Sequence, residues 1–453
     1  MNYARQDHSL VATNGKLYAI GGYFDGNFCD SIEEYDPQTN KWREVGKINL
    51  QIGGDNSFNN IVCIGIDLGT TYSCVAVLEN DQPVSIPCDN GLTIIPSIVG
   101  YCEDVIVVGS TAVSVGIQSE NILHDSKRLI GWGFLYDLPT ANPDLWPFKV
   151  DTRNNSAGYI LNKRRENEQF VKPEEVSAEI LKVLKTAAEK HIKKEVNCAV
   201  VTVPAQFNSK QRAATKRAAE LAGLELKYLL EEPIASALAY NQKMKLDNSR
   251  LLIVDFGGGT LDITIIEIID QFLEVKALTG DQHLGGRDID NRIMKYVISQ
   301  HHENSPRHNF RDPYTLRKLK TVCCERKEAL AYADSVSIMI DPNNQDDTPI
   351  NVRLTQEKLN ELCNDIFTKI TTIVDGAMKT ADLAKEGINY VILVGGSTRI
   401  KKVRQIFMDK FSEEKIRYFD ISPNEAVAFG AAIVADAIAK RQRIPSINLP
   451  YLF

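Results

Sequence analysis

The feature that most constrains the fold is a short motif that occurs twice: an apolar strand that ends in aspartate and runs into a glycine turn. "IGIDLGTT" places Asp67 before Gly69, and "LLIVDFGGGTLD" places Asp255 before Gly257. Glycine packs nothing and costs backbone entropy in a strand, so its presence there needs a reason. Backbone N–H groups of such a turn approach an anion closely, and neighbouring threonine hydroxyls add hydrogen-bond donors.

The carboxylate beside each turn narrows the choice of ligand. Asp67 and Asp255 would repel a phosphate unless a divalent cation lies between the two groups. Two matched turns can therefore clamp a polyphosphate and its metal from opposite sides. A single glycine turn also closes ordinary hairpins, but two copies, each after an apolar strand, predict a nucleotide site.

Composition sets few limits on function. The 453 residues are 43% hydrophobic and 25% charged, which is typical of soluble globular protein of about two to four domains. The net charge of −7 gives no reason to expect nucleic acid or an anionic membrane surface as a partner. No apolar run approaches the roughly 18 residues that span a bilayer, and the first residues do not resemble a signal peptide. We therefore expect a cytoplasmic chain, with its nine scattered cysteines reduced.

The N-terminal segment differs from the rest of the chain. Residues 8–46 read as short strands separated by turn signals, which are Asn14–Gly15, Asp25–Gly26 and Asp36–Pro37. The Gly21–Gly22 doublet, Tyr35 and Trp42 make this segment resemble one kelch repeat, a single blade of a β-propeller. Propellers need about four to eight blades, and no second copy is visible. The segment is either a flexibly attached fusion or gene-model remnant, or a blade donated to another kelch protein.

Domain boundaries follow from these changes of pattern. We predict one kelch-like repeat at 1–50, a linker at 51–60, and an α/β domain over 61–440 with a tail at 441–453. Within the α/β domain, the patterns predict helices at 173–192 and 209–223 and a buried strand near 197–204. Ser422 and Glu425 have the spacing of a capping box and predict a helix start there.

The α/β part resembles a known family through six motifs. They are "GIDLGTTYSC", "KRLIG", "VTVPAQFNSKQR", "DFGGGTLD", "GDQHLGGRDIDNR" and "LVGGSTRI". All six are similar to the ATPase domain of the seventy-kilodalton heat-shock (Hsp70) chaperones. The resemblance implies an actin-like, two-lobed fold with a duplicated RNase H-like core, preceded here by an orphan propeller blade. Lobe I would cover about 61–245 and lobe II about 246–440, closing over MgATP.

The resemblance also implies a role for each motif residue. Lys127 would orient the attacking water and balance charge on the γ-phosphate, with Asp262 assisting. Asp67 and Asp255 would hold Mg²⁺ through its waters, with Glu232 as a third acid nearby. The nucleotide would be bound by Gly69, Thr70, Thr71, Tyr72, Gly257, Gly258, Gly259, Thr260, Gly285, Gly286, Lys327, Gly395, Gly396, Ser397 and Arg399. The alternatives are that Lys127 lies on a solvated basic face and that Arg399 only pairs with a surface acid.

This chain departs from the family pattern at several positions. Within the site, Ile95, Glu231 and Arg287 stand where the long chaperones usually have Thr, Asn and Glu. In "CCERKEAL", Cys324, Glu328 and Ala331 replace Glu, Arg and Ser. In the family that Arg and the residue matching Arg399 sandwich the adenine, so base binding is expected to be weaker than phosphate binding. Alternatively, a one-residue shift would let Arg326 take the stacking place.

The sequence ends at Phe453, without the family's interdomain linker and peptide-binding half. In this respect it resembles the short, core-only microsomal stress-70 branch, so the endoplasmic reticulum is the alternative compartment. We expect a slow ATPase core that uses ATP/ADP and Mg²⁺, with K⁺ as a further candidate ion. As a monomer, it would act in protein folding and stress response through nucleotide-exchange factors, J-domain co-chaperones or ubiquitin-like quality-control proteins. The alternatives are a nucleotide-locked scaffold with negligible turnover and a small-molecule kinase of the same superfamily.

Overall fold

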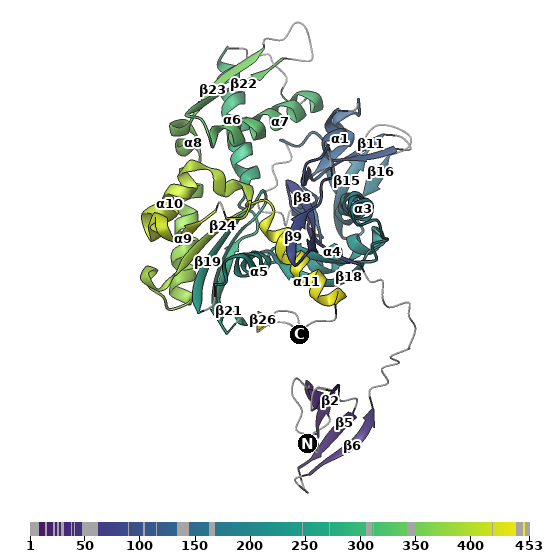
Figure 1. Ribbon diagram of the computed structural model, residues 1–453. Helices are drawn as coiled ribbons and strands as arrows, with labels where there is room; N and C mark the ends of the chain where they lie inside the picture. Colours follow the sequence, from purple (N-terminus) through teal and green to yellow (C-terminus); the bar gives the residue numbers. More distant parts are fainter. Residues whose placement is uncertain are drawn as a thin grey trace. The chain divides into compact units, whose positions relative to one another are not determined.

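The structure is a computed structural model of the chain (Figure 1). It contains two compact units, Met1–Asn60 and Ile61–Phe453. The residues that it describes are 9–13, 16–20, 23–24, 27–28, 31–37, 39, 41–47, 62–88, 90–102, 105–114, 116–133, 145–162, 168–246, 248–270, 272–304, 310, 312–341, 349–418, 420–440 and 447–448.

The first unit is a small antiparallel sheet with the strand order β1-β2-β5-β6. Its strands are Ser9–Thr13, Lys16–Ile20, Ser31–Asp36 and Lys41–Lys47, and a separate hairpin joins β3 (Tyr23–Phe24) to β4 (Asn27–Phe28). Tyr35 and Trp42 are cross-strand partners, with ring centroids 5.3 Å apart. Four antiparallel strands are what one propeller blade contains, and the described residues form no closed propeller.

Several sequence predictions for this unit fall on residues that the structure does not describe. They are the Gly21–Gly22 doublet, the turns at Asn14–Gly15 and Asp25–Gly26, and the linker at 51–60. The turn predicted at Asp36–Pro37 is described, and it connects β5 to β6.

The second unit contains two six-stranded sheets with related topology. The first sheet has the order β10-β8-β7-β17-β18, with β9 paired to β8. Its strands are β7 (Cys63–Asp67), β8 (Tyr72–Glu79), β9 (Gln82–Ser85), β10 (Ile94–Pro96), β17 (Cys198–Val203) and β18 (Glu225–Glu231).

The second sheet has the order β25-β24-β19-β20-β21-β26. Its strands are β19 (Ser249–Phe256), β20 (Leu261–Ile269), β21 (Phe272–Asp281), β24 (Tyr390–Val394), β25 (Ile416–Arg417) and β26 (Ile447–Asn448). In each sheet a central strand is antiparallel to the next strand in sequence and parallel to a later one: β7 to β8 and β17, and β19 to β20 and β24. This repetition confirms the predicted duplicated core.

Helices cover the outer faces of both sheets. In the first half, α3 (Pro173–Ile192) and α4 (Ser209–Leu221) pack on one another, and their apolar residues share a core with β7, β8 and β17. In the second half, the core of β19 and β20 is closed by α6 (Gly286–Asn304), α7 (Pro313–Leu330), α8 (Gln356–Leu362), α9 (Asn364–Thr380) and α10 (Lys401–Phe411).

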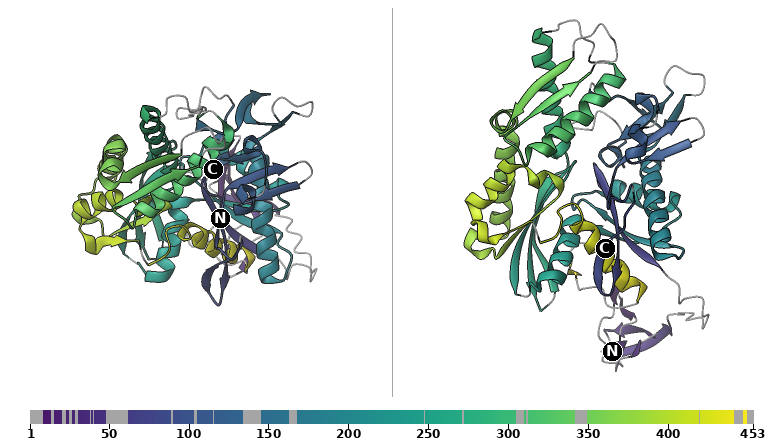
Figure 2. Two further views of the ribbon diagram at one scale, coloured as in Figure 1. Left: turned by 90° about the horizontal axis from the view of Figure 1, so that it is seen from above. Right: turned by 45° about the horizontal axis from the view of Figure 1, so that its top comes forward.

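Two further helices join the halves. A third core contains apolar residues of α5 (Glu232–Met244), α11 (Ala426–Ala439), β17 and β19, and α11 lies between the two halves in Figures 1 and 2. Gly430 permits this packing, because a Cβ there would be 1.9 Å from the carbonyl oxygen of Ala235 in α5. Gly65 of β7 has the same role, because a Cβ there would overlap the backbone of Ala432 in α11.

Smaller elements extend each half. The first half carries the sheet β12-β11-β13, the sheet β14-β15-β16 and two short helices. The bounds are β11 (Ile98–Cys102), β12 (Val105–Val108), β13 (Ile122–His124), β14 (Lys149–Arg153), β15 (Ser156–Leu161), β16 (Gln169–Val171), α1 (Ser110–Ser114) and α2 (Ser126–Leu129). The second half carries a hairpin of β22 (Ser335–Ile340) and β23 (Ile350–Thr355).

Local predictions for this unit are mostly confirmed. Helix α3 spans 173–192 with Pro173 in its first turn, α4 ends two residues before Gly223, and β17 is fully buried. The capping box at 422–425 is wrong. Helix α11 begins at Ala426 without a side-chain cap, because 422–425 form a turn in which the N–H of Glu425 bonds the carbonyl of Ser422. The carbonyl of Pro423 in that turn instead accepts from the N–H of Gly395.

Two properties concern the described residues as a whole. Among the described helices, none combines the length and the apolar character that crossing a bilayer requires. The described cysteine side chains are free thiols, and most of them are buried.

Candidate functional site

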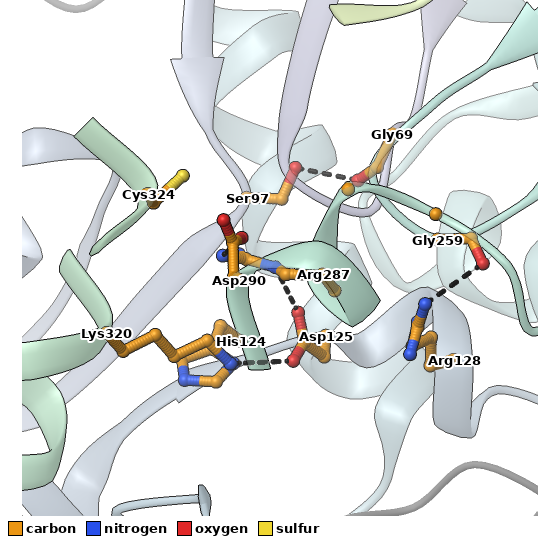
Figure 3. Close-up of polar contacts among 12 residues, drawn as sticks. Gly69, Ser97, His124, Asp125, Arg128, Gly259, Arg287, Asp290, Lys320 and Cys324 are labelled. Atoms are coloured by element: carbon orange, nitrogen blue, oxygen red, sulfur yellow. Dashed lines mark hydrogen bonds and ion pairs between the residues drawn. The ribbon is translucent and has the colours of Figure 1, made fainter. Parts of the chain in front are cut away.

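The first glycine turn connects β7 to β8. Gly69 has no room for a side chain, since a Cβ would stand 2.0 Å from the carbonyl oxygen of Tyr72. Its N–H donates to Ser73 Oγ at 3.2 Å, and its carbonyl accepts from Ser97 Oγ at 2.7 Å (Figure 3). The hydroxyls of Ser73 and Ser97 also lie within 2.9 Å of each other. Two buried serines therefore hold the backbone of this turn, which leaves Thr70 and Thr71 directed to the other half.

The second glycine turn connects β19 to β20 and is held by the start of α6. The backbone N–H of Gly286 donates to the carbonyl of Gly257 at 3.0 Å, and that of Arg287 to the carbonyl of Gly258 at 2.9 Å. Ser397 Oγ also donates to the carbonyl of Gly257, at 2.8 Å. These three hydrogen bonds occupy the carbonyl groups of the turn, so the carbonyls do not face a ligand bound by it.

The two turns meet face to face. A Cβ on Gly258 would lie 2.0 Å from Thr71 Oγ1, and a Cβ on Gly259 would lie 2.4 Å from Thr70 Oγ1. Any larger residue at either position would force the facing threonine side chain to move. The structure therefore brings together the two motifs that the sequence suggested as halves of a clamp.

A cavity of about 530 Å³ opens beside these turns. Most of the predicted site residues line it. They are Asp67, Gly69, Thr70, Thr71, Tyr72, Lys127, Glu232, Asp255, Gly257, Gly258, Gly259, Thr260, Gly286, Lys327, Gly395, Gly396, Ser397 and Arg399.

Two predicted site residues, Gly285 and Asp262, lie just behind the cavity wall. Gly285 packs on the second turn, where a Cβ would meet the carbonyl oxygen of Gly258 at 2.4 Å. Asp262 is 2% exposed and stands directly opposite Asp255 in the β19–β20 ladder. Within the described part of the chain, its Oδ2 has no hydrogen-bond partner.

Lys127 is the buried cation of the site. It lies in α2, and its Nζ forms an ion pair with Glu232 Oε1 at the first turn of α5. Burial lowers the pKa of Lys127, but the neighbouring carboxylates of Glu232 and Asp67 outweigh this effect and raise it overall. The ammonium group is therefore charged at neutral pH, and Lys127 does not lie on a solvated basic face.

The acids around Lys127 would carry more negative charge than it balances if all of them were ionised. Burial, with the nearby Glu232 carboxylate, raises the pKa of Asp67 to about 7 and that of Asp262 to about 8. The same causes raise the pKa of Asp255 well above its usual range. A divalent cation would supply the missing positive charge, and carboxylate oxygens suit Mg²⁺. No three acids, histidines or cysteines among the described residues are placed to ligate a metal directly.

Comparison with known proteins identifies the family. The family model described as "Hsp70 protein" matches residues 63–449. The chain belongs to the Hsp70 family. A kelch motif model matches residues 4–48, so both resemblances seen in the sequence are confirmed, and the second unit has the actin-like, two-lobed fold of an Hsp70 ATPase domain.

Curated Hsp70 proteins from distant organisms are similar to this chain. Heat shock cognate 70 kDa protein 3 of Dictyostelium discoideum is 37% identical over 391 residues, which is 85% of this chain and 62% of that protein. The heat shock 70 kDa protein of Emericella nidulans is 37% identical over 387 residues, 85% of this chain and 60% of that protein. The heat shock cognate HSP70 protein of Trypanosoma brucei brucei is 37% identical over 381 residues, which is 83% of this chain and 56% of that protein. The chain thus spans less than two thirds of these relatives' length.

The side of the cavity that the sequence predicts for adenosine is formed by the turn after β24 and the end of α7. Gly395 has a left-handed backbone (φ 82°), and a Cβ there would lie 2.4 Å from the carbonyl oxygen of Phe256. Lys327 lines the cavity, but its Nζ is held by Asp290 Oδ1 at 2.7 Å and the carbonyl of Gly286 at 3.2 Å.

The substituted positions have distinct surroundings. Ile95 is fully buried, and Glu231 pairs with Arg212 at 2.8 Å, so neither is directed at the cavity. Glu328 lines the cavity, and its Oε1 accepts from the hydroxyl of Tyr72 at 3.2 Å. Arg326 is exposed and does not line the cavity, which argues against the one-residue shift.

Arg287, where the long chaperones have Glu, lies in a buried charge cluster between the halves (Figure 3). Its Nε donates to Asp125 Oδ1 at 2.9 Å, and Lys320 Nζ of α7 donates to Asp125 Oδ2 at 3.0 Å. These cations keep the pKa of Asp125 well below its usual range despite burial. Burial and the charge of Lys320 lower the pKa of His124 to about 4. Two cations of the second half thus hold the residue that precedes α2 and Lys127.

Sequence reasoning missed several residues of the site. Asp125 and Lys320 carry no motif of their own, and their pairing joins positions far apart in the chain. Tyr332 and Asn424 line the cavity from a helix end and from the turn before α11. The one available signal was the resemblance to the family around "CCERKEAL", which implied that the end of α7 lies near the base but did not single out Tyr332.

Proposed function

We propose that this chain binds ATP with Mg²⁺ and hydrolyses it slowly to ADP and phosphate. The observation that carries the proposal is the contact between the two glycine turns, with Thr71 against Gly258, beside a cavity that also holds Lys127. Turns of this kind bind phosphate through backbone N–H groups, and a buried ammonium beside them balances phosphate charge.

The charges suggest a role for each group. Mg²⁺ would be held by Asp67 and Asp255 and, when bound, neutralises charge on the phosphates. Lys127 is fixed by Glu232, so its charge is already in place when negative charge develops on the transferred phosphoryl group. The unpartnered Oδ2 of Asp262 accepts a proton or a hydrogen bond from water once a nearby cation has lowered its pKa.

Measurements on the intact chain test this proposal. ATP binding at equilibrium and phosphate release in a single turnover would be compared with and without Mg²⁺. We expect tight binding with Mg²⁺ and slow, measurable release. Tight binding without phosphate release would show that the chain is a nucleotide-locked binding protein rather than an ATPase. Absence of binding would refute the nucleotide site altogether.

We further infer that the chain works in protein folding through co-chaperones, because its family and the names of its relatives are those of heat-shock proteins. Nucleotide-exchange factors and J-domain proteins are the partner classes to test first. Turnover would be measured with each candidate added, and in K⁺ against Na⁺ buffer. If no candidate changes turnover or nucleotide release, the proposed partner classes are wrong.

A further inference from the structure

An aromatic residue outside every recognised motif stands at the adenosine end of the cavity. Tyr332 comes two residues after α7 ends, lines the cavity, and is 74% exposed. Such exposure is unusual for a large aromatic side chain, since burying its ring is favourable. A ring left exposed at a cavity wall is available to a ligand.

The ring of Tyr332 is also held in position. Arg399 Nη1 donates to its hydroxyl at 2.9 Å. Arg399 itself lines the cavity from the turn after β24, so its partner is Tyr332 and the alternative of a surface acid is not supported. A single contact at the hydroxyl fixes the far edge of the ring and leaves its faces open to a flat ligand.

The residue one helical turn earlier cannot offer a stacking surface. Glu328 also lines the cavity, but it carries a carboxylate, and that group is bonded to the hydroxyl of Tyr72. Ala331 presents only a methyl group. Of the side chains that the end of α7 contributes to the described cavity wall, Tyr332 is therefore the one with a π face.

We propose that Tyr332, positioned by Arg399, is the surface on which the base of a bound purine nucleotide stacks. The inference rests on the proposed nucleotide site and names the group that selects the base. Stacking on an aromatic ring is effective for any base, and it favours purines because their faces are larger. In this chain the ring of Tyr332 would therefore contact the base, because Glu328 of α7 cannot.

The test compares two ligands on the intact chain: MgATP and magnesium tripolyphosphate, which has no base. Tyr332→Ala should weaken ATP binding roughly 5- to 100-fold, the range for one base–aromatic stack, and should leave tripolyphosphate binding unchanged. Tyr332→Phe keeps the ring and should stay within about threefold of wild type, since it loses one exposed hydrogen bond. Met339→Ala removes another large exposed side chain away from the cavity and serves as the control.

The outcomes separate the two proposals. If wild type binds ATP and Tyr332→Ala binds it equally well, the stacking inference fails while the nucleotide site stands. If Tyr332→Phe loses as much affinity as Tyr332→Ala, the ring by itself does not hold the base, and the inference again fails. If wild type binds neither ligand, the nucleotide site itself is wrong. Should Tyr332→Ala misfold by circular dichroism, Tyr332→Leu keeps apolar bulk without a π face and should lose ATP affinity similarly.

Discussion

Thr71 and Gly258 belong to different halves of the ATPase unit, yet Thr71 Oγ1 lies 2.0 Å from the point where a Cβ of Gly258 would stand. Only glycine permits this approach. The close approach of the two glycine turns therefore depends on the absence of a side chain at Gly258, and a substitution there tests it directly.

Gly258→Ala should weaken MgATP binding by about tenfold, because the added methyl group would overlap the Thr71 side chain and force that side chain and its turn to shift. Isothermal titration would measure the affinity. Gly376→Ala in α9, where a Cβ meets nothing within 4 Å, is the matched control. Equal ATP affinity in Gly258→Ala and Gly376→Ala would show that close contact of the turns is not needed.

Lys127→Ala should reduce single-turnover hydrolysis by about 100-fold or more, while equilibrium ATP affinity falls much less. A preorganised cation acts mainly on charge that develops in the transition state, whereas Mg²⁺ provides most ground-state binding. Lys182→Ala, on the exposed face of α3, controls for the loss of one lysine. Equal losses in rate and affinity, or no loss in either, would remove Lys127 from the proposed role.

The stability of the metal-free protein should fall as pH rises between about 4 and 8. The folded pKa values of Asp67 and Asp262, about 7 and about 8, lie above the ordinary 3.8. The folded state therefore holds protons that the unfolded state releases across this window, and the free energy of unfolding decreases as they are lost. Urea melts at several pH values would measure the slope. Asp262→Asn should make this slope smaller at the upper end of the pH window, and saturating MgATP should reduce the slope throughout. A slope that neither change alters would contradict the prediction.

Removal of residues 1–58 should leave folding and ATP binding of the remainder intact. The two units are separately compact, and the sheet of the first has its own strand pairing. Thermal melts and ATP titrations of the full and shortened chains would be compared. Loss of cooperative unfolding in the shortened chain would show that the kelch-like unit contributes to the core of the ATPase unit.

Glu328→Arg should tighten ATP binding by about 0.5–2 kcal/mol, the range for a restored cation–π contact with the base. Wild type should discriminate between ATP and GTP less than an Hsp70 that has arginine at this position. Glu328→Gln removes the charge without adding a stacking group and is the control. A strong wild-type preference for ATP, unchanged in Glu328→Arg, would show that position 328 does not determine base binding.

Local sequence patterns predicted what depends on short-range chemistry. The hairpins carrying Asp67 and Asp255 are evident because an apolar strand, an acid and a glycine turn are adjacent in the chain. The capping box at 422–425 failed because the N–H of Glu425 bonds the backbone carbonyl of Ser422 rather than its hydroxyl, and the turn so formed also accepts the N–H of Gly395, from a distant segment, at the carbonyl of Pro423. No local pattern reveals such a partner.

The sequence by itself determined the family, the two clamp turns and the acids and lysine beside them, since each depends on residues that are near neighbours in the chain. Only the tertiary structure decided which groups from distant parts of the chain meet. Asp125 pairs with Arg287 and Lys320, and Arg399 reaches Tyr332. These pairs join separate elements: Asp125 comes from the first half, Arg287 and Lys320 from α6 and α7, and Arg399 from the turn after β24. Packing of whole elements, which no short stretch encodes, therefore sets the charge balance around Lys127 and the surroundings of Tyr332.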